Sequence, residues 1–332
     1  MINKKQNSWS IAVFAARENV HTLEKTITAA LDASGSMTTV DVLVNGNRNL
    51  AHGIVRLLNA SINSSKTRSA NLRVWFIQLG DKAHAWNQYL QVIWPKSELT
   101  FFIDGYVRVD SNAFRLLDDA LLNSPEYLAA TGIPSIGWSA KSLRDEMLKN
   151  GGIHGNLFAL KKSTMEALRE LNFKLPLGLY RTDSTLGAAL SFGLDPSRYS
   201  WSPKTRILVH SDVTWATDKK VPWRFTDISG QLKRILRQGQ GILENLAVRD
   251  HLEIRKLRPE QLPDTATELV LRWTESHPDE FRKIFLQQPL LIFLAMKRLR
   301  QPKTWLDIDT SPELLLTAIL QNQKLCSSQI SN

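Results

Sequence analysis

Four short apolar segments alternate with helical patterns in the first hundred residues, and this alternation constrains the fold more than any other feature of the sequence. The apolar segments are residues 10–14, 40–44, 72–77 and 99–103. The segments that carry apolar side chains at helical spacing are residues 20–31, 50–58 and 83–92. Strands separated by helices of this length predict an α/β fold, with a mostly parallel central sheet and helices on both of its faces.

The rest of the chain has a different pattern. Further candidate strands, which indicate a mixed part of the sheet, are residues 127–136, 153–160 and 206–209. From about residue 227 onward only helical patterns remain, and Ser311-Pro312-Glu313 places proline at the first position of a predicted helix. We therefore predict an α/β domain over residues 1–218 and an all-helical C-terminal region over residues 219–332.

The balance of charge narrows the class of partner. Lys and Arg number 42 against 32 Asp and Glu, which gives a formal net charge of +10. Such a chain suits an anionic partner, whether a nucleotide, a nucleic acid or an anionic lipid surface. The sequence carries no helix-turn-helix, zinc or RNA-binding signature, so we expect no nucleic-acid partner. The one cysteine, Cys326, excludes an internal disulfide and a metal site built on several thiolates.

One segment bears on contact with membranes. Pro289–Met296 is mostly apolar, and a cationic stretch that includes Lys297, Arg298 and Arg300 follows it at once. The apolar run is far below the roughly 20 residues that span a bilayer, so we expect a soluble cytoplasmic protein. Two interpretations of the segment stay open. It is either a weak peripheral contact with the anionic inner face of the membrane or a helix packed on the rest of the protein.

Polar residues follow three of the predicted parallel strands. Arg17 and Glu18 come after the first strand, Asn45 comes after the second, and Asp104 ends the fourth. Ligands of open parallel sheets bind outside the carboxyl ends of the strands, so these side chains describe one ligand site. The alternative is that they are ordinary turn residues, because Asn, Asp and Gly favour turns in any protein.

The order and spacing of the motifs at these strand ends resemble the nucleotide-sugar half of family 2 glycosyltransferases with the GT-A fold. The matching stretches are Ala15-Ala16-Arg17-Glu18-Asn19, Asn45-Gly46-Asn47, Asp81-Lys82-Ala83-His84-Ala85-Trp86-Asn87 and Asp104-Gly105-Tyr106. The chain departs from the family at three points. Glu18 and Asn19 are transposed, Asn45 stands for an aspartate, and Tyr106 stands for the second acid of an Asp-x-Asp motif.

The resemblance implies roles for the donor side of the site. The residues implied to bind the nucleotide-sugar are Ala15, Arg17, Glu18, Asn45, Lys82 and Asp104. Glu18 and Asn45 would contact the base and ribose, and Lys82 would offset phosphate charge. Asp104 would face a metal–diphosphate, since Mn²⁺ or Mg²⁺ prefers carboxylate oxygens. His210, after the segment 206–209, is a candidate second metal ligand, with an ordinary surface histidine as the alternative.

The acceptor side offers a second set of residues. Gly151–Leu160 resembles the family's glycine-containing strand on the acceptor side. The predicted acceptor-binding residues are Trp138, His154 and Gly155. Thr182-Asp183 resembles the family's Glu-Asp element, which implies that Asp183 is the general base that deprotonates the acceptor hydroxyl. The alternative is that Asp183 only favours the start of a helix, as an acid does in any first turn.

The resemblance as a whole implies an inverting glycosyltransferase. It would move a sugar from a nucleoside diphosphate donor, with a UDP-sugar expected, to a hydroxyl of a glycan or a lipid-linked glycan. The three departures at the donor site leave a second hypothesis open, in which a catalytically impaired GT-A-fold protein binds or scaffolds in a glycan-synthesis pathway. Hydrolysis of nucleotide-sugars separates the two hypotheses, because a scaffold binds a donor without cleaving it.

Overall fold

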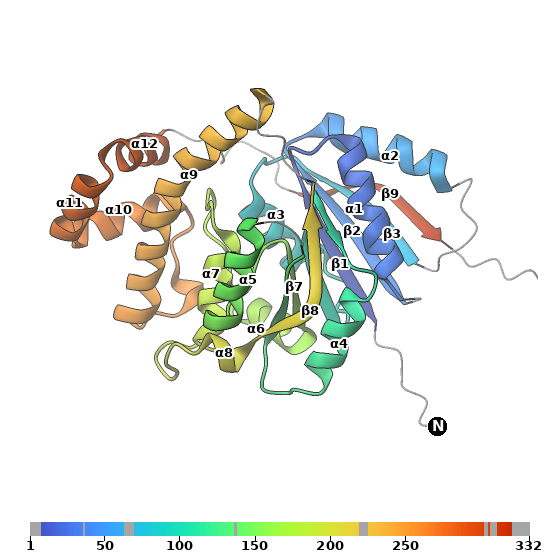
Figure 1. Ribbon diagram of the computed structural model, residues 1–332, viewed down its shortest axis with the longest axis horizontal. Helices are drawn as coiled ribbons and strands as arrows, with labels where there is room; N and C mark the ends of the chain where they lie inside the picture. The colour runs from blue at the N-terminus through green and yellow to red at the C-terminus, as the bar shows by residue number, and fades with distance from the viewer. Residues whose placement is uncertain are drawn as a thin grey trace, which may run out of the picture.

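The computed structural model describes residues 8–35, 37–62, 70–135, 138–218, 225–301, 305 and 311–320. The strands are β1 (Trp9–Ala15), β2 (Thr38–Asn45), β3 (Ala70–Ile77), β4 (Leu99–Asp104), β5 (Val107–Val109), β6 (Ala129–Pro134), β7 (Leu157–Lys161), β8 (Ile207–Thr217) and β9 (Glu313–Leu320). The helices are α1 (Val20–Ala33), α2 (Arg48–Ile62), α3 (Lys82–Gln88), α4 (Ala113–Leu122), α5 (Trp138–Asn150), α6 (Lys162–Glu170), α7 (Thr182–Ser191), α8 (Pro203–Arg206), α9 (Phe225–Arg249), α10 (Ala266–Ser276), α11 (Pro278–Gln287) and α12 (Pro289–Leu299). The strands form one sheet in the order β5-β8-β6-β7-β4-β1-β2-β3-β9, and helices cover both of its faces (Figure 1).

The predicted strands of the first hundred residues form the central part of this sheet. β4, β1, β2 and β3 lie side by side, and their three pairings are all parallel, which confirms the predicted α/β class. β7 then runs antiparallel to β4 and β6, while β8 runs parallel to β6 and antiparallel to β5. Because Leu157 at the start of β7 pairs with Ile103 of β4, the loop before β7 lies beside the carboxyl end of β4.

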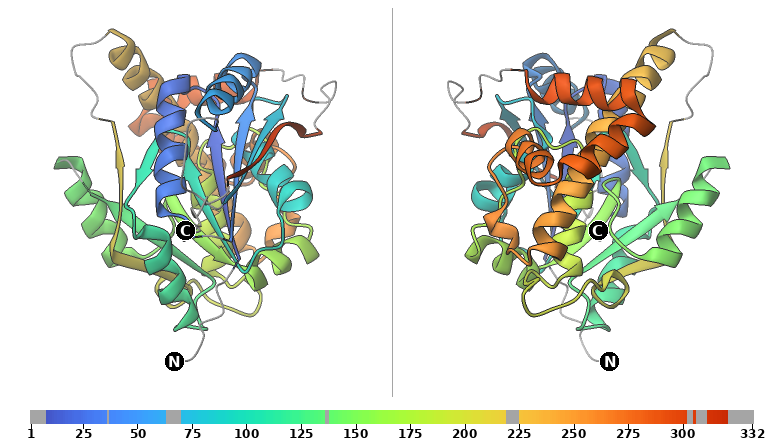
Figure 2. Two further views of the ribbon diagram at one scale, coloured as in Figure 1. Left: turned by 90° about the vertical axis from the view of Figure 1, so that its right-hand side faces the viewer. Right: turned by 90° about the vertical axis from the view of Figure 1, so that its left-hand side faces the viewer.

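Side-chain alternation along the strands builds a core on each face of the sheet. In β1, Ile11 and Val13 belong to a core that α1, α2 and α4 cover, while Ala12 and Phe14 belong to the opposite core. The opposite core also contains buried side chains of α3, α7, α9, α10 and α12. Figure 2 shows α9 to α12 gathered on this one side of the sheet. The C-terminal helices therefore share a core with the sheet that carries the predicted site.

The predicted helix at Ser311-Pro312-Glu313 is wrong, because Glu313–Leu320 is strand β9. β9 pairs antiparallel with β3, and Glu313 forms an ion pair of 3.0 Å with Arg48 of α2. Without β9, the backbone groups along one side of β3 would be unpaired at the edge of the sheet. Pairing satisfies those groups, and this tertiary contact outweighs the local helix signal. Within the described residues of the C-terminal region, α12 is therefore the last helix and strand β9 follows it.

The apolar run of the C-terminal region lies in α12. No helix in the described part of the chain is long and apolar enough to cross a bilayer. α12 packs against α9 and buries Ile292, Ala295, Met296 and Leu299. The packed-helix interpretation therefore holds for one face of α12.

Candidate active site

The carboxyl ends of the parallel strands meet at one edge of the sheet, where Phe14 of β1 is paired with Asp104 of β4. Asp104 is the last residue of its strand, and two side chains engage its carboxylate. Oδ1 forms an ion pair with Nζ of Lys82, and Oδ2 accepts a hydrogen bond of 3.0 Å from the Tyr106 hydroxyl. The apolar strand thus ends on an acid that faces a lysine.

Tyr106, at the position of the second acid of Asp-x-Asp, links the two sides of the site. Its hydroxyl lies 3.0 Å from Asp104 Oδ2 and 3.1 Å from Asn156 Oδ1, just before β7. Burial, followed by the charge of Asp104, raises the pKa of Tyr106 well above its ordinary value, so the phenol stays protonated. A neutral hydrogen-bond donor therefore stands where the resemblance expects a carboxylate.

The turns after β1 and β2 are braced by the polar side chains that the sequence singles out. Glu18 Oε2 accepts hydrogen bonds from the backbone amides of Ala16 at 2.7 Å and Arg17 at 2.9 Å. Asn45 is 4% exposed, and its amide, oriented to satisfy both neighbours, joins the carbonyl oxygen of Ala15 at 2.9 Å to the amide of Asp81 at 3.3 Å. Both side chains shape the wall of the site, and their contacts with a base and ribose stay predictions.

Glycine allows these turns to approach one another closely. Gly46 has φ +69°, and a Cβ at this position would collide with Cα of Gly80, which precedes the α3 turn. At Gly105 a Cβ would lie 2.9 Å from Cβ of Ala15 at the end of β1. This close packing places the N-termini of α1 and α3 next to the carboxyl end of β4.

Lys82 is the cation at this point. It is the first residue of α3, whose N-terminus is capped by the Asp81 side chain. Burial lowers the pKa of Lys82, but the carboxylates of Asp104, Asp183 and Glu18 raise it by more, so the net pKa lies above its ordinary value and the ammonium stays charged. The acids come from three separate segments, and the fold brings all of them within electrostatic reach of one lysine.

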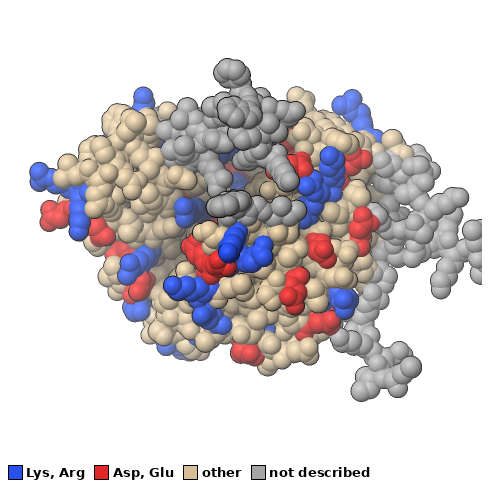
Figure 3. Space-filling view, viewed as in Figure 1, with Lys and Arg blue, Asp and Glu red and all other residues tan. Residues whose placement is uncertain are grey.

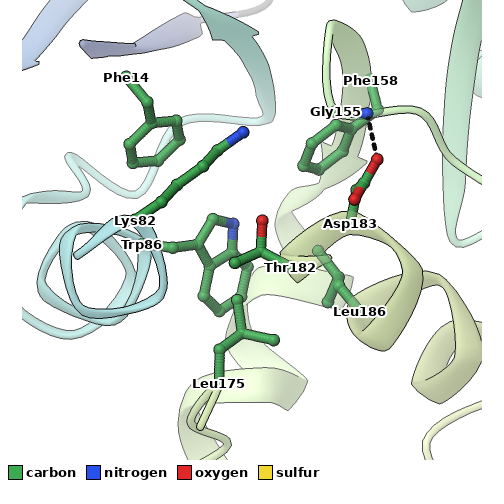
Figure 4. A pocket seen from close by; sticks show the side chains of 9 residues that line it. All are labelled: Phe14, Lys82, Trp86, Gly155, Phe158, Leu175, Thr182, Asp183 and Leu186. Atoms are coloured by element: carbon green, nitrogen blue, oxygen red, sulfur yellow. Dashed lines mark hydrogen bonds between the residues drawn. The ribbon is translucent and has the colours of Figure 1, made fainter. Parts of the chain in front are cut away.

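Asp183 faces Lys82 from the first turn of α7 (Figure 4). Its Oδ2 accepts a hydrogen bond of 2.8 Å from the backbone amide of Gly155. A Cβ at position 155 would lie 3.1 Å from that oxygen, so glycine leaves room for the carboxylate. The Asp183 side chain thus reaches across the site to another segment, a contact that support of its own helix does not require.

A recess lies between these two charged groups. Its lining residues are Phe14, Lys82, Trp86, Gly155, Phe158, Leu175, Thr182, Asp183 and Leu186. Figure 4 shows Lys82 and Asp183 on opposite walls, with aromatic and aliphatic side chains around them. Apolar surroundings lower the local dielectric constant, which strengthens the interaction of both charges with a bound ligand.

Two arginines add positive charge near the recess. Arg17 is exposed in the turn after β1, and Arg237 lies on α9 within electrostatic reach of it. Burial, followed by the like charges of Arg17 and Arg298, lowers the pKa of Arg237. Like charges that are held together favour an anionic ligand, because the ligand relieves their repulsion.

A buried glutamate that the sequence analysis did not single out holds the loop before α7. Glu244 of α9 is 1% exposed, and it accepts backbone hydrogen bonds from Tyr180 at 2.9 Å and Arg181 at 3.2 Å. Gln240 donates to Glu244 at 2.7 Å and to the Gly178 carbonyl at 2.9 Å. α9 therefore positions the segment that carries the candidate base. No sequence signal reveals this, because the bonded residues are 62 to 64 positions apart.

Glu244 should make stability depend on pH. Burial raises its pKa from 4.5 to about 7, even though the amides of Tyr180 and Arg181 and the Gln240 side chain lower it. Between these values the folded state keeps a proton that the unfolded chain has released, so stability falls as pH rises. We expect wild type to lose about 3 kcal/mol relative to Glu244→Gln across this range. Chemical unfolding of both proteins between about pH 5 and about pH 8 measures this, and parallel stability curves would contradict it.

The predicted acceptor residues are brought to the recess only in part. Gly155 lines it. The His154 ring stacks on Trp215 of β8, with ring centres 5.0 Å apart, and Trp215 is itself a core residue at 6% exposure. Trp138 begins α5, but its side chain lies outside the described part of the chain. Gly155 is therefore the predicted acceptor residue with a direct contact to Asp183.

The structure does not bring His210 to Asp104. His210 lies in β8, and β6 and β7 separate this strand from β4. Three strand spacings of about 4.8 Å correspond to roughly 14 Å, which is too far for two ligands of one ion. The Nδ1 atom of His210 accepts a hydrogen bond of 3.2 Å from the amide of Asp212 instead.

The remaining side chains do not fit a metal centre built by the protein. Asp104 is a single carboxylate, and Lys82 and Tyr106 engage both of its oxygens. Among the residues that the structure describes, no group of three or more His, Cys, Asp or Glu could hold a metal ion. The described side chains therefore do not form a metal site by themselves, and the Mn²⁺ or Mg²⁺ that the resemblance implies stays a prediction.

No protein-family model and no curated protein sequence matches the chain. The fold does match a solved structure: mannosyltransferase PcManGT from Pyrobaculum calidifontis in complex with GDP-Man and Mn²⁺. The TM-score is 0.53 over 89% of this chain and 85% of that chain, at 14% sequence identity. The chain therefore shares its fold with this mannosyltransferase, while membership of family 2 stays a prediction.

Proposed function

We propose that the chain is an inverting glycosyltransferase that moves a sugar from a nucleoside diphosphate donor to a hydroxyl of a glycan or a lipid-linked glycan. The observation that carries this proposal is the placement of Lys82 and Asp183 on opposite walls of one recess, with Asp183 held by the Gly155 amide. The fold that the chain shares with a mannosyltransferase supports it.

In the proposed reaction the donor diphosphate lies on the Lys82 side of the recess and the acceptor hydroxyl lies at Asp183. The acceptor oxygen forms a bond to the anomeric carbon as the bond from that carbon to the diphosphate oxygen breaks. The hydroxyl proton passes to the Asp183 carboxylate, and the leaving diphosphate takes the electron pair of the broken bond. Attack from the face opposite the leaving group inverts the anomeric carbon, and the Lys82 ammonium offsets the developing negative charge.

On the donor side of the recess, side chains of the protein would offset the charge of the diphosphate, and the nucleotide remains to be identified by experiment. Lys82, with Arg17 nearby, supplies the positive charge, and no step is assigned to a metal because the donor set of Asp104 does not fit one. A UDP-sugar is the expected donor. The solved mannosyltransferase structure contains GDP-Man and Mn²⁺. GDP-sugars, and measurements in the presence of Mn²⁺, therefore belong in the experiment that tests the donor.

A thermal-shift screen of UDP-sugars and GDP-sugars, each with Mn²⁺ and with EDTA, tests the proposal. A donor at about 100 times its Kd should stabilise the fold by about 2.7 kcal/mol and raise Tm. Product analysis of the positive wells should then show cleavage or transfer of the sugar. Absence of a shift with every donor would contradict the proposal. Binding with no cleavage or transfer to any acceptor would favour the scaffold hypothesis instead.

A further inference from the structure

The corner between α11 and α12 exposes a cluster of large apolar side chains. Leu286 at the end of α11 is 70% exposed, and Leu290 and Phe293 on α12 are 70% and 55% exposed. Leu290 and Phe293 are three positions apart, so they lie on the same face of the helix. We name Leu286, Leu290 and Phe293 the apolar corner. At the upper left of Figure 3, where α12 lies, the surface is largely uncharged, and charged side chains gather at the left edge below it.

The apolar corner is held rigidly by the other face of α12. Ile292, Ala295, Met296 and Leu299 are buried in the core shared with α9. A Cβ at Gly239 of α9 would lie 2.7 Å from the carbonyl oxygen of Leu291, so the two helix backbones are in close contact. α12 therefore cannot roll its exposed leucine and phenylalanine inward without removing the buried set from the core.

The charges around the apolar corner are mostly positive. Within residues 278–300 the cations are Arg282, Lys283, Lys297, Arg298 and Arg300, and the anions are Asp279 and Glu280, which gives 5 − 2 = +3. The side chains of all seven are exposed. Apolar side chains bordered by cations fit a surface that is apolar inside and anionic at its boundary.

We propose that the apolar corner docks on an anionic lipid bilayer, with its leucines and phenylalanine at the acyl boundary and the flanking cations at lipid phosphates. A second copy of the chain fits less well, because a symmetric contact would place two +3 corners against each other. The docking surface stands on these exposures and charges and does not depend on the proposed reaction.

Vesicle flotation of the full chain tests this surface. We expect binding to phosphatidylcholine vesicles that contain roughly 30% phosphatidylglycerol at low salt, none to phosphatidylcholine alone, and release at high salt. Changing Lys297, Arg298 and Arg300 together to Ser should weaken binding by about fivefold for each cation removed. The triple change Leu286→Ser, Leu290→Ser and Phe293→Ser should weaken it by at least about tenfold.

The matched control makes the same kind of change elsewhere. Met37, Val92 and Leu122 are 57%, 62% and 53% exposed in the α/β part of the chain, and their joint change to Ser should leave vesicle binding intact. All variants should keep the wild-type Tm, because the changed side chains are exposed. Failure of wild type to bind anionic vesicles at low salt would overturn the proposal. Equal binding by the apolar-corner variant, or a lipid-free dimer that this variant abolishes, would overturn it as well.

Discussion

Replacement of Asp183 by asparagine is expected to lower kcat by roughly 10²- to 10⁴-fold, because an amide cannot accept the proton of the acceptor hydroxyl. Asparagine keeps an oxygen that can accept the hydrogen bond from Gly155, which is 2.8 Å long in the native protein, so the loop should stay in place. Donor affinity should stay within about twofold, since Lys82 and the strand-end turns are unchanged. Steady-state kinetics and calorimetry with the donor nucleotide measure the two effects separately.

Glu166→Gln is the matched control, since it makes the same carboxylate-to-amide change at an exposed position of α6. It should alter neither turnover nor donor affinity. If Asp183→Asn turns over like this control, Asp183 is not the base. If Asp183 only supports the start of α7, the Asp183→Asn variant should keep full turnover and lose about 0.3–1 kcal/mol of folding stability.

Lys82→Met should lower kcat/KM by roughly 10²- to 10³-fold and weaken donor binding, because it removes the charge that faces the leaving diphosphate. Methionine keeps an unbranched apolar stem against the wall of the recess. Lys82→Arg should retain part of the activity, since it keeps the charge and changes the geometry. We expect the same loss for Lys82→Met in Mn²⁺ and in EDTA. Full activity of this variant with Mn²⁺ would show that a metal, not Lys82, carries the charge.

A loss of folding must be separated from a loss of function at Lys82. Removing the ammonium leaves the Asp104 carboxylate, whose side chain is 14% exposed, without its cation. The double variant Lys82→Met with Asp104→Asn removes both charges and should recover any stability that the single variant loses. Activity should not recover with it. Recovery of turnover in the double variant would mean that Lys82 serves only to neutralise Asp104.

Much of the site could be predicted because its signals are local. A strand has a side-chain period of two and a helix a period of 3.6, so the central strands and α1 to α3 follow from apolar spacing alone. Polar residues at parallel strand ends must meet at one edge of the sheet, which is why Asp104 could be named in advance, while Lys82 was named from the resemblance. Two other candidates have local contacts of their own. Asn45 braces two turns, and His210 lies three strands from the acid it was expected to join.

The sequence by itself determined the alternation of strands and helices and the acid at the end of β4. Its resemblance to a known family named Lys82 and the candidate base at the start of α7. Only the tertiary structure decided that Glu313–Leu320 is a strand, that Glu244 holds the loop before Asp183, and that Tyr106 bridges to Asn156. The reason is physical. Local preferences amount to tenths of a kcal/mol for an ordinary residue, whereas an unpaired sheet edge or an unsatisfied buried carboxylate costs several times more. Which segment pairs with a sheet edge or hydrogen-bonds to a buried carboxylate depends on which elements the fold places next to it. A short stretch of sequence does not contain that information.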